Sequence, residues 1–263
     1  MNARPQADAK AFPHVADYQP RAVDQAVLPR DFIAAMAAND AAPAPARREI
    51  YHLVHKGLRA AMSDALVGLG RVDLDSNAQR LDVLGRVADL LSLCAEHLEH
   101  ENAFLHSAME KAKPGASRDC AADHAHHVKA IADLRQRHDE ALSADATGRE
   151  RAFKVLYRRL ASFVAENFAH MEIEESTNTA LLWQHYTDAE ILAIEHQIHA
   201  HIKPERMMTW LRWILPHVTR QQRATMMRGM QAGMPQELFA AVLEMIKPHL
   251  TETERAALVT DLA

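Results

Sequence analysis

The chain contains 263 residues, with 5% aromatic residues and 8 glycines, a composition that favours helices over strands. A net charge of −5 without a long run of Lys and Arg argues against nucleic acid as a partner. No stretch reaches the roughly 18 uninterrupted apolar residues of a membrane span, and the first residues lack the apolar core of a secretory signal. Neither Cys94 nor Cys120 has the spacing of a zinc site or a disulfide framework, so we expect a cytoplasmic protein with reduced thiols.

Residues 1–46 are rich in Ala and Pro and carry few apolar residues at helical spacing. We therefore predict an Ala/Pro-rich N-terminal arm or linker, with one short helix near residues 31–38. From residue 47 the pattern changes, because apolar side chains recur every three or four residues. We expect a packed helical domain to begin there.

Four long helices are predicted next, at residues 47–69, 77–111, 118–142 and 149–185. The second one ends clearly, because Pro114 and Gly115 follow it. The connections between the helices are short, so neighbouring helices are expected to run antiparallel. The predicted fold class is all-α, with an up-down-up-down four-helix bundle at residues 47–186.

Residues 187–263 carry a different signal, a series of helix starts. Thr187, Thr219 and Thr251 each precede a Glu or Gln by three residues, which is the pattern of a capping box. Pro204 and Pro235 suit first-turn positions. We predict four or five shorter helices here, which form a C-terminal helical extension packed on the bundle.

Three tryptophans lie in or near this extension: Trp183, Trp210 and Trp213. We expect them to pack between the bundle and the extension. A partner-binding face is the alternative, because aromatic clusters also anchor interfaces. The C-terminal helices are therefore candidates for binding a protein partner or a second copy of the chain.

Two His–Glu motifs stand out within the second and fourth predicted helices. His97 and Glu101 are four residues apart, so they share one face of a helix, which advances about 3.6 residues per turn. The same spacing returns at His170 and Glu174. If the two helices face each other, two imidazoles and two carboxylates meet inside the bundle. That donor set suits a pair of first-row metal ions.

The first and third predicted helices also place histidines on what would be their inner faces. A single histidine on an apolar face is more often a satisfied core residue than a metal ligand. Burying several imidazoles with two carboxylates, however, is costly without a cation, so the joint pattern favours a metal site. Two further histidines, His100 and His126, lie off this stripe, and we expect them to be exposed. The inner-face candidates are His52, His55, His124 and His127.

The segment from Arg47 to His185 contains four phrases in order: IYHLVHKGLR, HLEHENAFLH, DHAHHVKAIADL and FVAENFAHMEIEE. Together they resemble the four helix motifs of the hemerythrin-like (HHE cation-binding) family. The resemblance implies a bundle around a non-haem diiron centre, in which two iron ions share an oxo or hydroxo bridge and two carboxylates. Matched motif by motif, it implies the metal ligands His55, His97, Glu101, His124, His127, His170 and Glu174.

The sequence departs from the oxygen-carrying hemerythrins in two spacings. Those proteins place an Asp five residues after the fourth-helix histidine, whereas here Glu174 comes four residues after it and Glu175 five, so either could bridge. Their second histidine of the third helix follows the first by four residues, whereas His127 follows His124 by three. The resemblance therefore leaves open five imidazole ligands, or four and a water. Surface or core packing is the expected role of His52, one turn before His55, with an alternative ligand or a hydrogen-bond partner of the site as the other readings.

The expected function is binding or sensing of dioxygen, peroxide or nitric oxide, with peroxidase- or catalase-like activity as an option. A second hypothesis is an iron- or oxygen-responsive regulatory module that acts on a partner through its C-terminal helices. A third is a bundle whose metal is only structural.

Overall fold

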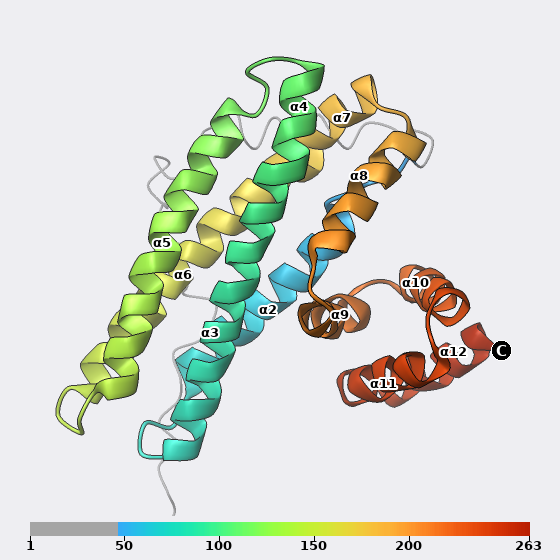
Figure 1. Ribbon diagram of the computed structural model, residues 1–263. Coiled ribbons are helices and arrows are strands. Elements are labelled where there is room, and N and C mark those ends of the chain that lie inside the picture. The colour runs from blue at the N-terminus through green and yellow to red at the C-terminus, as the bar shows by residue number, and fades with distance from the viewer. Residues whose placement is uncertain (1–46) are drawn as a thin grey trace, which may run out of the picture. The chain divides into compact units, whose positions relative to one another are not determined.

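The computed structural model describes residues 47–263 (Figure 1). The predicted N-terminal arm, including the short helix near residues 31–38, lies outside the described residues. The described part of the chain is all-helical and contains no strand. None of its helices has the length and apolar character needed to cross a membrane.

Four long helical stretches follow one another up to residue 185, close to the predicted positions. Two of them are interrupted by a π-helical turn, so each is divided into two α-helices. Their bounds are α2 His52–Arg71, α3 Asn77–His100 continuing through the π turn Glu101–His106 into α4 Ser107–Ala112, α5 Arg118–Ser143, and α6 Arg149–Ile173 continuing through the π turn Glu174–Asn178 into α7 Thr179–His185.

The predicted start of the first helix was wrong by five residues, because α2 begins at His52 and not at residue 47. The backbone before it makes contacts outside a helix. The carbonyl oxygen of Arg48 accepts a hydrogen bond of 2.8 Å from Trp183 Nε1, and Arg47 donates one of 2.7 Å to the carbonyl oxygen of Tyr186. These bonds hold the residues before α2 against the C-terminal end of α7.

The two π turns were not predicted, since the apolar periodicity suggested uninterrupted α-helices. Each turn begins at the carboxylate of a His–Glu motif, Glu101 in one case and Glu174 in the other. A π turn inserts one extra residue into the helical repeat, and such turns are frequent at functional sites. The side chains that follow are therefore rotated relative to a regular α-helix.

The long helices pack around a shared interior. α2 packs against α3 and α6, and α5 packs against the same two helices. The interior contains two apolar clusters, and residues such as Leu58, Leu91 and Leu156 belong to the larger one. A smaller cluster contains Leu105 and Leu182. Along the chain, the two His–Glu motifs lie between residues of the larger and the smaller cluster.

The rest of the chain forms five shorter α-helices and one 3₁₀ turn, as the helix-start signals suggested. All three predicted capping boxes are present, at Thr187, Thr219 and Thr251, and Pro204 occupies the first turn of its helix. Pro235 is the N-cap of its helix, so its predicted first-turn position was wrong by one residue. The bounds are α8 Asp188–His201, α9 Pro204–His217, α10 Arg220–Gly233, α11 Gln236–Ile246, the 3₁₀ turn Lys247–His249, and α12 Glu252–Leu262.

One of these helices, α9, packs directly on α2. Trp210 of α9 is buried in the larger apolar cluster. The two helices approach closely at Gly57, where a Cβ atom would lie 2.9 Å from Ile214 Cγ1. α9 also contributes Leu211 and Leu215 to a separate, methionine-rich cluster with α10, α11 and α12. Trp210 therefore packs between the two regions, as predicted.

Candidate metal centre

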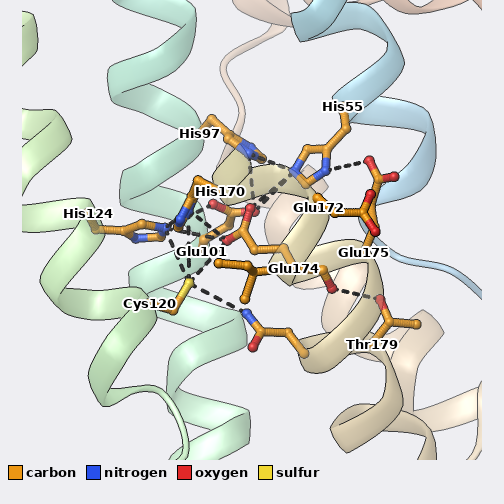
Figure 2. A network of polar contacts seen from close by, with 12 residues as sticks. His55, His97, Glu101, Cys120, His124, His170, Glu172, Glu174, Glu175 and Thr179 are labelled. Carbon is orange, nitrogen blue, oxygen red and sulfur yellow. Dashed lines mark hydrogen bonds and ion pairs between the residues drawn. The ribbon is translucent and has the colours of Figure 1, made fainter. Parts of the chain in front are cut away.

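Six of the seven predicted ligands converge in the interior of the long helices (Figure 2). Five of these six side chains are buried, and His97 is 11% exposed. Each long helical stretch contributes at least one of them. The six are His55 from α2, His97 and Glu101 from α3 and its π turn, His124 from α5, and His170 and Glu174 from α6 and its π turn.

The first group of donor atoms joins α2 and α3. His55 Nε2 lies 3.1 Å from His97 Nε2, and His97 Nε2 lies 3.1 Å from Glu101 Oε1. His55 Nε2 is also 3.7 Å from Glu101 Oε1 and 3.5 Å from Glu174 Oε2. Two imidazole nitrogens and two carboxylate oxygens thus surround one point.

The second group joins α5 and α6. His124 Nε2 lies 2.9 Å from His170 Nε2 and 3.6 Å from Glu101 Oε2. Glu174 Oε1 lies 3.4 Å from His124 Nε2 and 3.2 Å from His170 Nε2. Glu101 and Glu174 therefore belong to both groups, and each carboxylate directs one oxygen to each group.

The other ring nitrogen of three histidines is held by a hydrogen-bond acceptor. His55 Nδ1 donates to Glu175 Oε1 at 2.9 Å, and Glu175 also pairs with Arg59. The remaining two bonds run from His124 Nδ1 to Asn102 Oδ1 at 2.8 Å and from His170 Nδ1 to Asp123 Oδ2 at 3.3 Å. Such partners orient metal-binding imidazoles, because a protonated Nδ1 leaves the lone pair on Nε2.

Imidazole nitrogens face each other in two histidine pairs, and their lone pairs repel unless a positive charge lies between them. The Nε2 atoms of His55 and His97 point at each other, as do those of His124 and His170, so a proton or a cation is needed between them. Both oxygens of Glu101 and Oε2 of Glu174 are buried without a hydrogen-bond partner. Ligands of one ion at about 2.0–2.1 Å lie about 2.9–3.4 Å apart, from octahedral to tetrahedral arrangements. The observed separations and donor types therefore fit two first-row divalent cations.

The pKa shifts of the converging side chains also indicate that a positive charge is favoured among them. Burial and the neighbouring charge of Glu174 raise the pKa of Glu101 to about 7. Burial acts to lower the pKa of His55, but Glu101 and Glu175 outweigh it and raise this pKa to about 9. Burial and the adjacent charge of His55 lower the pKa of His97 well below its usual value. In the absence of a metal, a proton on His55 thus takes the place that a cation would fill.

His127, the seventh predicted ligand, is buried but belongs to neither group. Its ring lies edge-on against that of His170, with centroids 4.9 Å apart, and its Nδ1 atom has no partner. Burial and the nearby charge of His170 lower its pKa to about 4. Three residues after His124, it is rotated away from the point on which His124 converges.

The remaining candidates have other surroundings. Glu175 orients His55 and lies in neither group, and partly exposed His52 lies 3.7 Å from Glu49. His126 is exposed, as predicted, but the prediction for His100 was wrong, because this side chain is half-buried.

Sequence reasoning missed Cys120 and His106, which form a further set of close donor atoms with His124 and Glu174. Cys120 precedes His124 by four residues, the same spacing as in the His–Glu motifs, so its position was open to prediction. His106 follows Glu101 by five residues and faces inward because of the π turn between them. Burial and the charge of Glu174 raise the pKa of the Cys120 thiol.

Tyr51 was also missed. Its side chain is buried, its hydroxyl group has no hydrogen-bond partner, and its ring centroid lies 5.4 Å from that of His55. Burial and the charges of Glu174 and Glu101 raise its pKa well above the usual value. Tyr51 comes one helical turn before His55, but the sequence offered no second polar residue to single it out.

Comparisons of the chain with protein-family models, with curated proteins and with solved structures gave no match.

Proposed function

We propose that this protein is a hemerythrin-like diiron protein that binds or senses dioxygen, peroxide or nitric oxide. In this proposal the four long helical stretches form an up-down-up-down four-helix bundle, and α8–α12 are its C-terminal extension. The proposed ligands are the six converging residues. His55 and His97 would hold one iron ion and His124 and His170 the other, while Glu101 and Glu174 would contribute to both.

One observation carries the proposal: both buried carboxylates divide their oxygens between the two histidine pairs. Glu101 Oε1 faces His97 and its Oε2 faces His124, whereas Glu174 Oε2 faces His55 and its Oε1 faces His170. A carboxylate that paired with a single cationic side chain would not need this arrangement. It is the arrangement expected of carboxylates that bridge two ions.

The imidazole-rich donor set supports the choice of chemistry. Bound iron in such surroundings would supply reversible redox change and binding of a small ligand. The protein's own residues orient the donors, since Glu175, Asn102 and Asp123 hold three imidazoles through Nδ1. Apolar residues of the two flanking clusters, such as Leu98 and Leu105, keep bulk water from the group.

A direct test is the absorption spectrum of the iron-loaded protein, recorded before and after addition of dioxygen, hydrogen peroxide or nitric oxide under anaerobic control. We expect at least one of these ligands to change the spectrum reversibly or to be consumed catalytically. Iron-loaded protein whose spectrum responds to none of the three would contradict the proposed function.

A regulatory module is the second candidate, and one contact favours it. The Trp210 ring of α9 lies 6.4 Å from the ring of His97, which is the most exposed of the six converging residues. A change at the centre therefore has a direct path to α9. Hydrogen exchange of α9 that differs between metal-loaded and metal-free protein would support this candidate, and equal exchange would contradict it.

A further inference from the structure

The Cys120 thiol lies against the second group of donor atoms, and the centre proposed above does not use it. Cys120 is 5% exposed. Its Sγ atom lies 3.8 Å from His124 Nε2 and 3.9 Å from His170 Nε2. It lies 3.4 Å from Glu174 Oε1. The sulfur therefore contacts three of the atoms that would hold one ion (Figure 2).

Cys120 Sγ and the three atoms that it contacts also lie close to one another. The separations among the other three are 2.9 Å between the two imidazole nitrogens, and 3.4 Å and 3.2 Å from these to Glu174 Oε1. A tetrahedral ion with nitrogen ligands at about 2.0–2.1 Å and a sulfur ligand at about 2.3 Å has its ligand atoms about 3.3–3.6 Å apart. The observed set, with one sulfur, two nitrogens and one oxygen, has separations from 2.9 Å to 3.9 Å, a range that brackets these values.

One neighbour of the sulfur would stabilise a thiolate bound to a metal ion. Asn178 Nδ2 donates a hydrogen bond of 3.5 Å to Cys120 Sγ. Asn178 is the last residue of the second π turn and is buried. Hydrogen-bond donors to sulfur are a usual second layer around thiolate ligands, where they tune the metal.

We propose that Cys120 is a metal ligand and that its thiolate completes the second cation position, to which His124, His170 and the two shared carboxylates of Glu101 and Glu174 also contribute. This inference rests on the proposed function, because it presupposes a metal centre. The sulfur loses its proton to solvent when it binds the ion. The first position contains imidazoles and carboxylates, so the two positions differ chemically. The second position favours thiophilic ions more strongly.

Cobalt(II) provides the test, because a thiolate bound to it produces a charge-transfer absorption that imidazole and carboxylate ligands do not. The metal-free protein is titrated with cobalt(II), and bound metal is counted separately. Cys94→Ser is the matched control, since Cys94 is the other buried cysteine and lies in the apolar cluster. We expect the charge-transfer band in the wild type and in Cys94→Ser. Cys120→Ser should lose the band and retain visible cobalt bands from the first position.

Two outcomes would overturn the inference in distinguishable ways. Wild-type protein that binds cobalt without a thiolate band would remove Cys120 from the ligand set and leave the proposed centre intact. Wild-type protein that binds no cobalt or iron would contradict both the inference and the proposed function. The wild-type spectrum alone decides between these results, so the test does not depend on the folding of Cys120→Ser.

Discussion

Two almost completely buried charged residues, Arg223 of α10 and Glu101 of the π turn, show how the two regions of the molecule differ. Arg223 is 3% exposed and donates hydrogen bonds to the carbonyl oxygens of Leu215, Pro216 and Val218 and to the carboxylate of Glu254. Glu101 is 2% exposed, and neither of its oxygens has a hydrogen-bond partner.

The difference between Arg223 and Glu101 shows which buried charged group has its hydrogen-bond partners within the protein and which one lacks them. In the C-terminal helices the protein supplies four acceptors for the buried guanidinium group, three of them carbonyl oxygens near the end of α9. Among the long helices the protein supplies oriented donors, and in the described part of the chain the carboxylates of Glu101 and Glu174 pair with histidines and with no Arg or Lys side chain. Unsatisfied buried groups are costly, so their accumulation at one point indicates a ligand with positive charge.

The largest expected effect is on metal content. His124→Ala should remove most of the metal, because it deletes a donor of the second group, whereas His126→Ala should bind the normal amount. The two histidines are two residues apart on α5, but His126 is exposed and contacts Glu166 at 3.2 Å. Elemental analysis of both purified variants measures the difference. Equal metal content in the two variants would contradict the assignment of His124 as a ligand.

The next effect is on stability without metal. In chelator-treated protein, Arg223→Met should lower the free energy of unfolding by about 1–3 kcal/mol, because it leaves buried backbone acceptors without a donor. Glu101→Gln should lower it less, since neither oxygen of Glu101 has a hydrogen-bond partner and the amide removes a buried charge. Chemical denaturation of both variants provides the values. A loss in Glu101→Gln as large as in Arg223→Met would mean that the protein already satisfies Glu101.

A smaller effect is expected from the residue that orients His55. Glu175→Gln should weaken metal binding about 10–100-fold and leave the ligand atoms in place, because it removes the charged partner of His55 Nδ1. Glu166→Gln, at a partly exposed carboxylate of α6, is the control and should bind normally. Competition with a chelator of known affinity measures both. Unchanged affinity in Glu175→Gln would show that His55 needs no such partner.

The smallest effect belongs to the C-terminal helices. Thr219→Ala removes a capping-box side chain that accepts a hydrogen bond from the backbone of Gln222, and it should cost about 0.5–2 kcal/mol. The same variant should bind the wild-type amount of metal, because it changes α10 only. Thermal denaturation and metal analysis of the one sample test both statements. A change in metal content would indicate that the two regions are more strongly coupled than the contact at α9 suggests.

Local signals explain why much of the fold could be predicted from the sequence. The three capping boxes lie within four consecutive residues each, and all three were predicted correctly. The long helices followed from apolar periodicity. The start of α2 could not be predicted, because it depends on hydrogen bonds with Trp183 and Tyr186, more than 130 residues away in the chain.

The donor set was predictable only in part, for a related reason. His–Glu spacing within a helix indicated His97 with Glu101 and His170 with Glu174, and the structure brings both pairs together. The positions of His106 and Asn178 depend on the π turns, which have no simple sequence signal. Cys120 could have been recognised from its spacing to His124, but a single cysteine is usually a small core residue.

The account depends most directly on whether the buried group binds two ions. Elemental analysis of protein produced with iron supplied, and purified without chelator, tests this. The account predicts about two iron ions per chain, as expected for two groups of donors that share Glu101 and Glu174. Protein that contains zinc alone, or no metal, would contradict it.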